Sequence, residues 1–250
     1  MVNCAIFADT GFEPTYVYKH LEWLKNELSF PIYIVKSKDE QTNKGILEHT
    51  LKTIKGTAEA YNAPPFFSNK GLIRRQCTHH YKIFPIRLKI RELLGLKKHQ
   101  RCPTKDKDYF VYQYIGISKD EMNRMTINRD KYIKNIYPLV EKNITRKDCI
   151  NWLKNNNYPI VKKSACMFCP YHDNDTWKDM KKNRPKDFAM VVKIDEKLRN
   201  SKSKKYPFDR KLYMHWSLKP LKNINFDKPI KDPRTKKRTF NDECEGMWGV

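Results

Sequence analysis

The chain has 250 residues, of which 39% are hydrophobic and 12% aromatic, enough to bury a core and to exclude disorder throughout the chain. Lysine and arginine number 51 against 28 aspartate and glutamate, a formal charge of +23, so either a polyanion partner or a lysine-rich solvated surface explains the excess. Seven cysteines with no N-terminal targeting signal, and no apolar run long enough to cross a bilayer, predict a soluble, cytoplasmic protein whose thiols bind metal or do redox chemistry.

The first 54 residues alternate between strand and helix patterns. Residues 2–9 form a continuous apolar run, typical of a strand buried on both faces, and residues 30–37 form a second run. Residues 14–28 carry apolar side chains at helical spacing, and residues 38–54 predict another helix that contains Gly45. This order predicts an α/β fold with a parallel sheet and flanking helices.

The same two periods predict the later elements. Ser118 is expected to cap a short helix that follows a strand, and a Thr-x-x-Asp cap opens a later amphipathic helix. Four prolines after residue 200 predict an irregular tail that lies over the body. The predicted elements are helices over 85–95, 145–157, 173–182 and 185–200 and a strand over 109–118.

Cys166 and Cys169 form a C-x-x-C turn, which places two sulfurs within reach of one metal ion or one cluster edge. The alternative is a buried turn with two unreactive thiols. Two thiolates do not close a tetrahedral site, so the remaining ligands must come from distant segments. Cys77, in "RRQCTHHYK", has basic neighbours that favour its thiolate.

Cys77, Cys166 and Cys169 are therefore the preferred metal ligands, with Cys244 or a histidine as the fourth. Thiolates in this number fit zinc and a [4Fe–4S] cluster alike, and the residues alone do not choose between them. Each candidate histidine is more commonly a surface or hydrogen-bonded side chain. These are His79, His80 and His172, whereas Cys4 and Cys149 are expected in the core and Cys102 as an exposed thiol.

Asp9, Thr10 and Gly11 end the first predicted strand, and ligands bind outside the carboxyl ends of strands in open α/β sheets. Asp9 offers an acceptor for a ribose or base edge, Thr10 a donor, and Gly11 a close backbone approach. Lys82 and Arg87 follow Cys77 and are candidates to bind phosphate or sulfate. On the residues alone the turn is a weak signal, because Asp-Gly turns after strands are ordinary. A basic helix face is the alternative for these cations, favoured for Lys89 and Arg91 but not for Lys82 and Arg87.

Six segments together resemble the phosphoadenosine phosphosulfate (PAPS) reductase-like family, within the adenine-nucleotide α-hydrolase, or PP-loop, group. The resemblance implies a HUP-type sheet that binds an adenine nucleotide, ATP or PAPS, at the strand ends around Asp9, Thr10 and Gly11. It also favours a [4Fe–4S] cluster over zinc on the three preferred cysteines. The segments are "IFADTGFEPTYVYKHLEWL", "RRQCTHHYKIFPIRLKIRELLG", "IGISKDEMNRM", "YPLVEKNITRKDCINWLKNNNYP", "KSACMFCPYHDNDTW" and "ECEGMWG".

The C-terminal "ECEGMWG" resembles the tail that carries the nucleophilic cysteine of sulfonucleotide reductases. The resemblance makes Cys244 a candidate catalytic nucleophile as well as a candidate ligand. The chain then divides into an adenine-nucleotide-binding-like part (1–143), a helical metal-binding part (144–200) and a basic irregular tail (201–250).

The family's phosphate loop, a Ser-Gly-Gly-x-Asp-Ser turn after the first strand, has no counterpart here. We expect that loop and its strand to be missing, which leaves an exposed sheet edge for a partner chain. A longer natural chain, a loop supplied by a partner and a loss of nucleotide chemistry are the three explanations.

Two functions follow. The first is an oxidoreductase or ATP-dependent sulfurtransferase that acts on PAPS, tRNA or DNA with an adenine nucleotide and an iron–sulfur cluster. The second is a catalytically inactive binding or structural module in which the metal is a folding staple.

Overall fold

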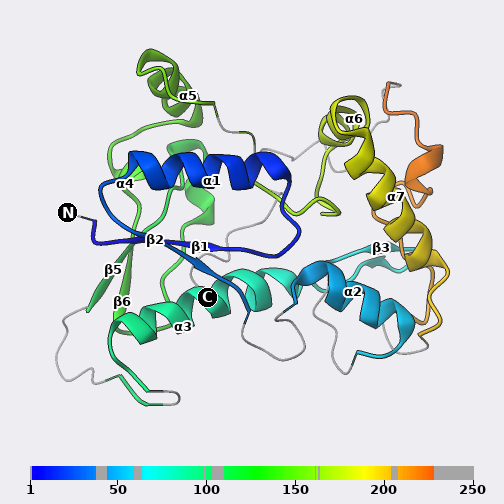
Figure 1. Cartoon of the computed structure of the whole chain (residues 1–250), viewed down its shortest axis with the longest axis horizontal. Coiled ribbons are helices and arrows are strands. Elements are labelled where there is room, and N and C mark those ends of the chain that lie inside the picture. The colour runs from blue at the N-terminus through cyan, green and yellow to red at the C-terminus, as the bar shows by residue number, and fades with distance from the viewer. Residues whose placement is uncertain are drawn as a thin grey trace. The chain divides into compact units, whose positions relative to one another are not determined.

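The structure is a computed structural model that describes residues 2–37, 44–58, 64–97, 100–102, 110–160, 162, 164–203 and 208–227. Figure 1 shows the ribbon of the chain. The chain divides into two compact units: unit 1 is Met1–Pro85 with Ser164–Arg238, and unit 2 is Ile86–Lys163 with Thr239–Val250. The division at residues 143 and 200 that follows from the sequence stays a prediction.

Unit 1 is built on a parallel strand pair, as predicted. Strand β1 (Ala5–Ala8) pairs with β2 (Ile32–Val35), and α1 (Thr15–Glu27) forms the crossover between them. The expectation that the first strand is buried on both faces is wrong, because its side chains are half-buried apart from the buried Ala8. Cys4, expected in the core, is half-buried as well.

Helix α2 (Ile46–Lys55) begins one residue after Gly45, so the prediction of a helix that contains this glycine is wrong. Gly45 has φ 91°, which no helical residue adopts and which favours glycine. The helix ends at Gly56, whose left-handed conformation is typical of a C-terminal cap. Residues 38–43, predicted as the first turns of this helix, lie outside the described residues.

The rest of unit 1 combines a small hairpin with helices. A π-helical turn, η1, runs directly into α3, whose first two residues belong to unit 1 and the remainder to unit 2. The two helices predicted near 173–182 and 185–200 are confirmed. The elements are β3 (Phe67–Ser68), β4 (Gly71–Leu72), η1 (His79–Ile83), α3 (Phe84–Leu93), α6 (Asn174–Asn183), α7 (Pro185–Arg199) and η3 (Leu221–Asn223).

The main core of unit 1 draws on segments far apart in the sequence, including the predicted irregular tail. The buried carboxylate of Asp195 on α7 accepts the backbone N–H groups of Met214 (3.2 Å) and Leu221 (3.0 Å) and pairs with Arg199. These bonds hold the tail against α7, so that residues of the tail contribute to the core. The buried apolar side chains of the tail are Phe208, Leu212, Met214, Leu221, Ile224 and Phe226.

Unit 2 repeats the parallel pair with β5 (Val111–Tyr114) and β6 (Ile133–Ile136). Between and after these strands lie η2 (Lys119–Arg124), α4 (Pro138–Glu141) and α5 (Arg146–Asn155). The predicted cap of α5 is confirmed, because Thr145 and Asp148 form a reciprocal capping box. Ser118 occupies the position before η2, but its hydroxyl faces the Glu121 carboxylate at 3.5 Å rather than a backbone N–H group.

The α/β class is confirmed, and the sheet is divided. Over the described ranges the strands form two separate two-stranded parallel pairs and one antiparallel hairpin. The HUP-type sheet and the partner chain at its open edge stay predictions. Among the helices that the structure describes, none is both long and apolar enough to cross a membrane.

Candidate metal and nucleotide site

The turn that follows β1 is organised by Asp9, whose side chain is buried at 7% exposure. Its Oδ1 accepts the backbone N–H of Gly11 at 2.8 Å and the hydroxyl of Tyr18 at 2.9 Å. Its Oδ2 lies 3.4 Å from the ammonium of Lys36. Burial, and then the bond to Asp9, raise the pKa of Tyr18, so this phenol stays protonated and donates to the turn.

Two glycines allow the turn to touch the start of α2. A Cβ on Gly45 would lie 3.0 Å from the carbonyl oxygen of Thr10 and 3.2 Å from the Cα of Gly11. Gly11 has φ 77°, so it too needs the left-handed region. The N–H of Ile46 donates to the Thr10 carbonyl at 2.9 Å, which fixes the first residue of α2 against the predicted nucleotide-binding turn.

Glu13, which sequence reasoning missed, joins this turn to the cysteine segment. Its carboxylate is buried at 4% exposure and accepts the Thr10 hydroxyl at 3.0 Å and, from 151 residues away, the Ser164 hydroxyl at 3.3 Å. Phe12 adds a backbone bond, since its carbonyl accepts the N–H of Met167 at 3.0 Å. The one sequence signal was an acidic residue in the apolar stretch "GFEP" between a strand and a helix.

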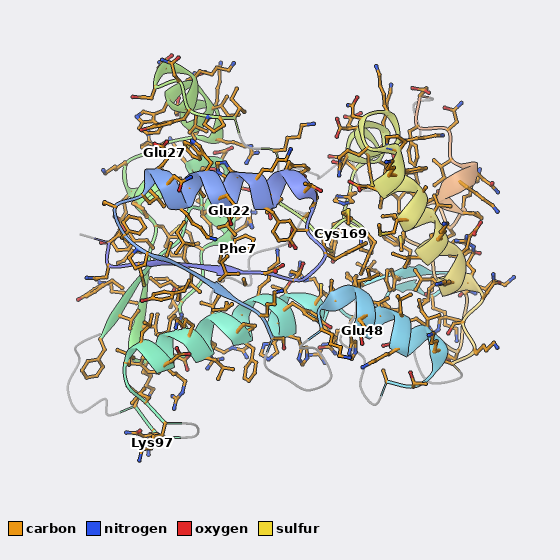
Figure 2. The ribbon with its side chains drawn as sticks, viewed as in Figure 1. Phe7, Glu22, Glu27, Glu48, Lys97 and Cys169 are labelled. Atoms are coloured by element: carbon orange, nitrogen blue, oxygen red, sulfur yellow. The ribbon has the colours of Figure 1, made fainter. Side chains whose placement is uncertain are left out.

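The C-x-x-C segment folds as a tight turn beside this junction. The N–H of Cys169 donates to the carbonyl of Cys166 at 3.0 Å, and both side chains are buried. Figure 2 shows Cys169 beside the end of α1 that follows Pro14. The rings of Phe12 and Phe168, 4.9 Å apart, pack the two segments together.

Cys77 reaches the same core from a third segment. Its side chain is half-buried and packs against the cluster that contains Cys166 and Cys169. The guanidinium of Arg75 lies 5.6 Å from the ring centre of Tyr171, a second tie between these segments. The three preferred cysteines therefore share one apolar cluster, although two of them are about 90 positions from the third.

The electrostatics of the cluster favour the protonated thiol. The hydrogen bond with the Cys169 thiol, then burial and the nearby Glu13 carboxylate, raise the pKa of Cys166, with a smaller contribution from Cys77. A metal cation reverses this balance, because it binds the thiolate and displaces the proton. We therefore expect metal uptake by Cys166 to release a proton.

Within the described ranges, no group of three or more His, Cys, Asp or Glu side chains is arranged to hold a metal ion. The cysteine cluster thus has the donors of a metal centre without their ligating arrangement. Cys244, the predicted fourth ligand and nucleophile, lies outside the described residues. Cys102, expected to be exposed, and Cys149, expected in the core, are both half-buried thiols of unit 2.

The three candidate histidines lie near the cysteines in sequence, with different surroundings. The buried ring of His172 lies edge-on to Trp177 at 4.8 Å, and its backbone N–H closes the cysteine turn on Cys169 at 3.1 Å. His79 is exposed, and its ring meets that of His80 at 5.1 Å. These contacts match ordinary packed and surface histidines.

The two predicted phosphate ligands belong to different units. Lys82 is half-buried in the π-helical turn η1 of unit 1, and single π-turns occur frequently at functional sites. Arg87 lies in unit 2, where its guanidinium pairs with the Asp130 carboxylate at 2.6 Å. A phosphate at Arg87 would have to compete with this carboxylate.

No protein-family model, curated protein or solved structure matches the chain. The residues of the site therefore carry the functional argument by themselves.

Proposed function

We propose that the protein is a PAPS reductase-like enzyme that uses an adenine nucleotide, ATP or PAPS, and a cysteine-bound [4Fe–4S] cluster in sulfur transfer or sulfonucleotide reduction. The observation that carries the proposal is the meeting of three distant segments in unit 1. Cys77 packs against the core cluster of Cys166 and Cys169, and that cluster is bonded to the turn after β1 through Glu13.

The donor chemistry of the cluster fits a metal centre. Cys77, Cys166 and Cys169 would hold it, with Cys244 as the fourth ligand, and an apolar shell of the kind around them raises the strength of charge interactions within it. When bound, a [4Fe–4S] cluster supplies single electrons or a positive field next to the substrate. Zinc on the same thiolates is the alternative, and it would supply the field alone.

The turn after β1 would hold the nucleotide mainly with its backbone. Both Asp9 oxygens already have partners inside the protein, so Asp9 contributes by keeping the Gly11 N–H and the Tyr18 hydroxyl in place. Lys36, which follows β2, has an exposed ammonium 3.4 Å from the Asp9 carboxylate and is a charged group beside this turn that a phosphate could recruit. If Cys244 is the nucleophile, its thiolate would attack the sulfur of PAPS, so that an S–S bond forms as the bond from this sulfur to the nucleotide's phosphate oxygen breaks and the nucleotide leaves with that electron pair.

The saturated Asp9 carboxylate also favours the second candidate, an inactive module that keeps a metal staple. In that protein the bonds of Asp9, Glu13 and Ser164 would serve the fold, and the metal would stabilise it. Both candidates require metal on the cysteines, and only the enzyme requires an adenine nucleotide.

Nucleotide titration tests the enzyme against the module. Calorimetry of the full chain, purified without oxygen, should show binding of ATP or PAPS and none of GTP, which differs in its base. Asp9→Ala should abolish binding because it releases the turn. Asp9→Asn is the matched control, since its amide oxygen can still accept from Gly11 and Tyr18. Absence of adenine-nucleotide binding, or wild-type affinity for the nucleotide in Asp9→Ala, would contradict the proposal that the protein is a nucleotide-using enzyme.

A further inference from the structure

Large exposed aromatic side chains occupy the outer face of β5 in unit 2 and the residue just before this strand. Phe110, Tyr112 and Tyr114, which we call the aromatic stripe, are 54%, 56% and 54% exposed. Val111 and Gln113, between them, are half-buried. Because alternate residues of a strand point to opposite faces, the rings of Tyr112 and Tyr114 share one face of β5, and Phe110 is the residue just before the strand.

The stripe rests on a well-fixed strand pair. β6 aligns with β5 in parallel, Tyr112 opposite Lys134 and Tyr114 opposite Ile136. On the opposite face, Asn128 donates toward Gln113 at 3.5 Å and Asn135 at 3.2 Å. The rings are therefore presented by a backbone that binding does not have to order, which lowers the entropic cost of binding.

The charge around the stripe indicates the partner. Lys134 is exposed and lies on the same face as Tyr112, because residues in register share a face. Exposed Arg129 and Lys131 lie in the segment that leads into β6. Residues 86–163 carry 19 Lys and Arg against 8 Asp and Glu, so a polyanion is favoured over an uncharged apolar protein surface.

The spacing of the rings favours a single strand over a duplex. Alternate residues of a strand are about 6.7 Å apart, twice the rise per residue. Stacked nucleotides lie about 3.4 Å apart, so bases can lie on successive rings only when the strand is extended and its stack is opened. The bases of a duplex are paired and stacked, with no free face for a ring.

We propose that the aromatic stripe and Lys134 bind single-stranded nucleic acid, with bases stacked on the rings and the phosphates near the cations of unit 2. This gives a substrate class, DNA or RNA, to the function proposed above. It rests on that function only for what is done to the strand. Binding itself depends on residues of unit 2 that have no part in the cysteine cluster.

Fluorescence anisotropy of the full chain with labelled oligonucleotides tests the stripe. Single-stranded DNA, single-stranded RNA and a DNA duplex of equal length form the three arms, each over a series of salt concentrations. Tyr112→Ala with Tyr114→Ala should weaken single-strand binding by roughly 5- to 100-fold per ring. Tyr112→Phe with Tyr114→Phe keeps the rings and should bind like the wild type.

Trp152→Ala is the matched control, because Trp152 is an aromatic side chain of α5 in the same unit and is 57% exposed. It should change single-strand affinity by less than about twofold. Lys134→Gln should weaken binding and reduce its salt dependence. Unchanged melting temperatures would exclude unfolding as the cause.

Three results would overturn the proposal: wild-type affinity in the double alanine variant, a duplex bound as tightly as a single strand, or binding that does not weaken with salt. The last would show that the cations of unit 2 do not contact the phosphates. Metal content and nucleotide titration of the same double variant should equal the wild type. Failure of the stripe is thus separable from failure of the proposed enzyme.

Discussion

The two units of this chain use the same parallel strand pair in opposite ways. In unit 1 the end of β1 leads into a buried polar turn, where Asp9 and Glu13 have hydrogen-bond partners from α1 and from the cysteine segment. In unit 2 the strand β5 turns its aromatic side chains to the solvent. The comparison shows that the same four-residue parallel pair can support different surfaces. The residues that follow the strand in unit 1, and the side chains on the strand in unit 2, determine which groups each unit offers to a ligand.

Among substitutions that should affect one unit and not the other, we expect the largest effect from Cys166→Ser. Loss of this buried thiol, a proposed metal ligand, should abolish metal binding and lower the stability of unit 1, with no effect on the β5–β6 pair. A chelator should then lower the melting temperature of the wild type and leave that of the variant unchanged.

Cys149→Ser is the control for this prediction, because Cys149 is a half-buried thiol on α5 in unit 2. It should keep the wild-type metal content. Equal metal content in Cys166→Ser and in the wild type would show that the cysteine cluster does not bind the metal. The contrast between the two units would then be one of fold alone.

A smaller effect is expected at the glycine that docks α2 on the turn. Gly45→Ala adds a Cβ 3.0 Å from the Thr10 carbonyl at φ 91°, and should cost about 3 kcal/mol in the free energy of unfolding. Gly71→Ala has a similar φ of 95° with nothing within 4 Å of the added Cβ, and should cost about 1 kcal/mol. Urea denaturation measures both, and equal costs would show that the close approach to Thr10 is not tight.

The smallest effect is expected at the cap of α5 in unit 2. Thr145→Ala removes one half of the capping box and should cost about 1 kcal/mol, whereas Thr145→Ser keeps the hydroxyl and should cost little. Metal content should not change, since the cap belongs to the other unit.

The pH dependence of this cap has a definite sign. Bonds from the Thr145 hydroxyl, and then from its backbone N–H, lower the pKa of Asp148. The stabilisation is therefore present above the ordinary value of 3.8 and is lost as pH falls through the lowered pKa. The difference in the free energy of unfolding between Thr145→Ala and the wild type should become smaller in acid. A difference that does not change with pH would show that the Asp148 carboxylate does not contribute to the cap.

The elements that the sequence predicted are those with a local signal. α1 and α5 have apolar side chains at helical spacing, and α5 also has a cap that can be seen in four residues. β6 was missed because "IKNI" has two polar residues among four, and the hairpin strands are only two residues long. Such short elements are set by their neighbours rather than by their own composition.

The site was predicted in part. The three cysteines were chosen from their spacing and neighbours, and they share one core cluster. The Gly45 misassignment arose because its positive φ is required by Thr10 and Gly11, a contact between separate segments. Glu13 gave almost no signal, because a buried carboxylate is recognisable only by the hydroxyls that donate to it.

Exposure was the least predictable property. "YFVYQYIGIS" is as apolar as a buried strand, yet three of its aromatic side chains are more than half exposed. Conversely, the proline-containing tail was predicted to lie over the body, but six of its apolar side chains are buried, and Asp195 holds the tail to α7 through two backbone hydrogen bonds. The exposure of the aromatic side chains and the burial of the tail side chains both depend on which segments pack against each other, and this is a property of the tertiary fold.

The central claim is that thiols from two distant segments share one inorganic centre, and metal analysis of Cys77→Ser tests it most directly. Wild-type protein purified without oxygen should contain iron and sulfide in the ratio of a [4Fe–4S] cluster, with a broad visible absorbance. Cys77→Ser should lose most of both while Cys149→Ser keeps them. Full iron and sulfide in Cys77→Ser, or a wild-type protein that takes up neither iron nor zinc, would contradict the account.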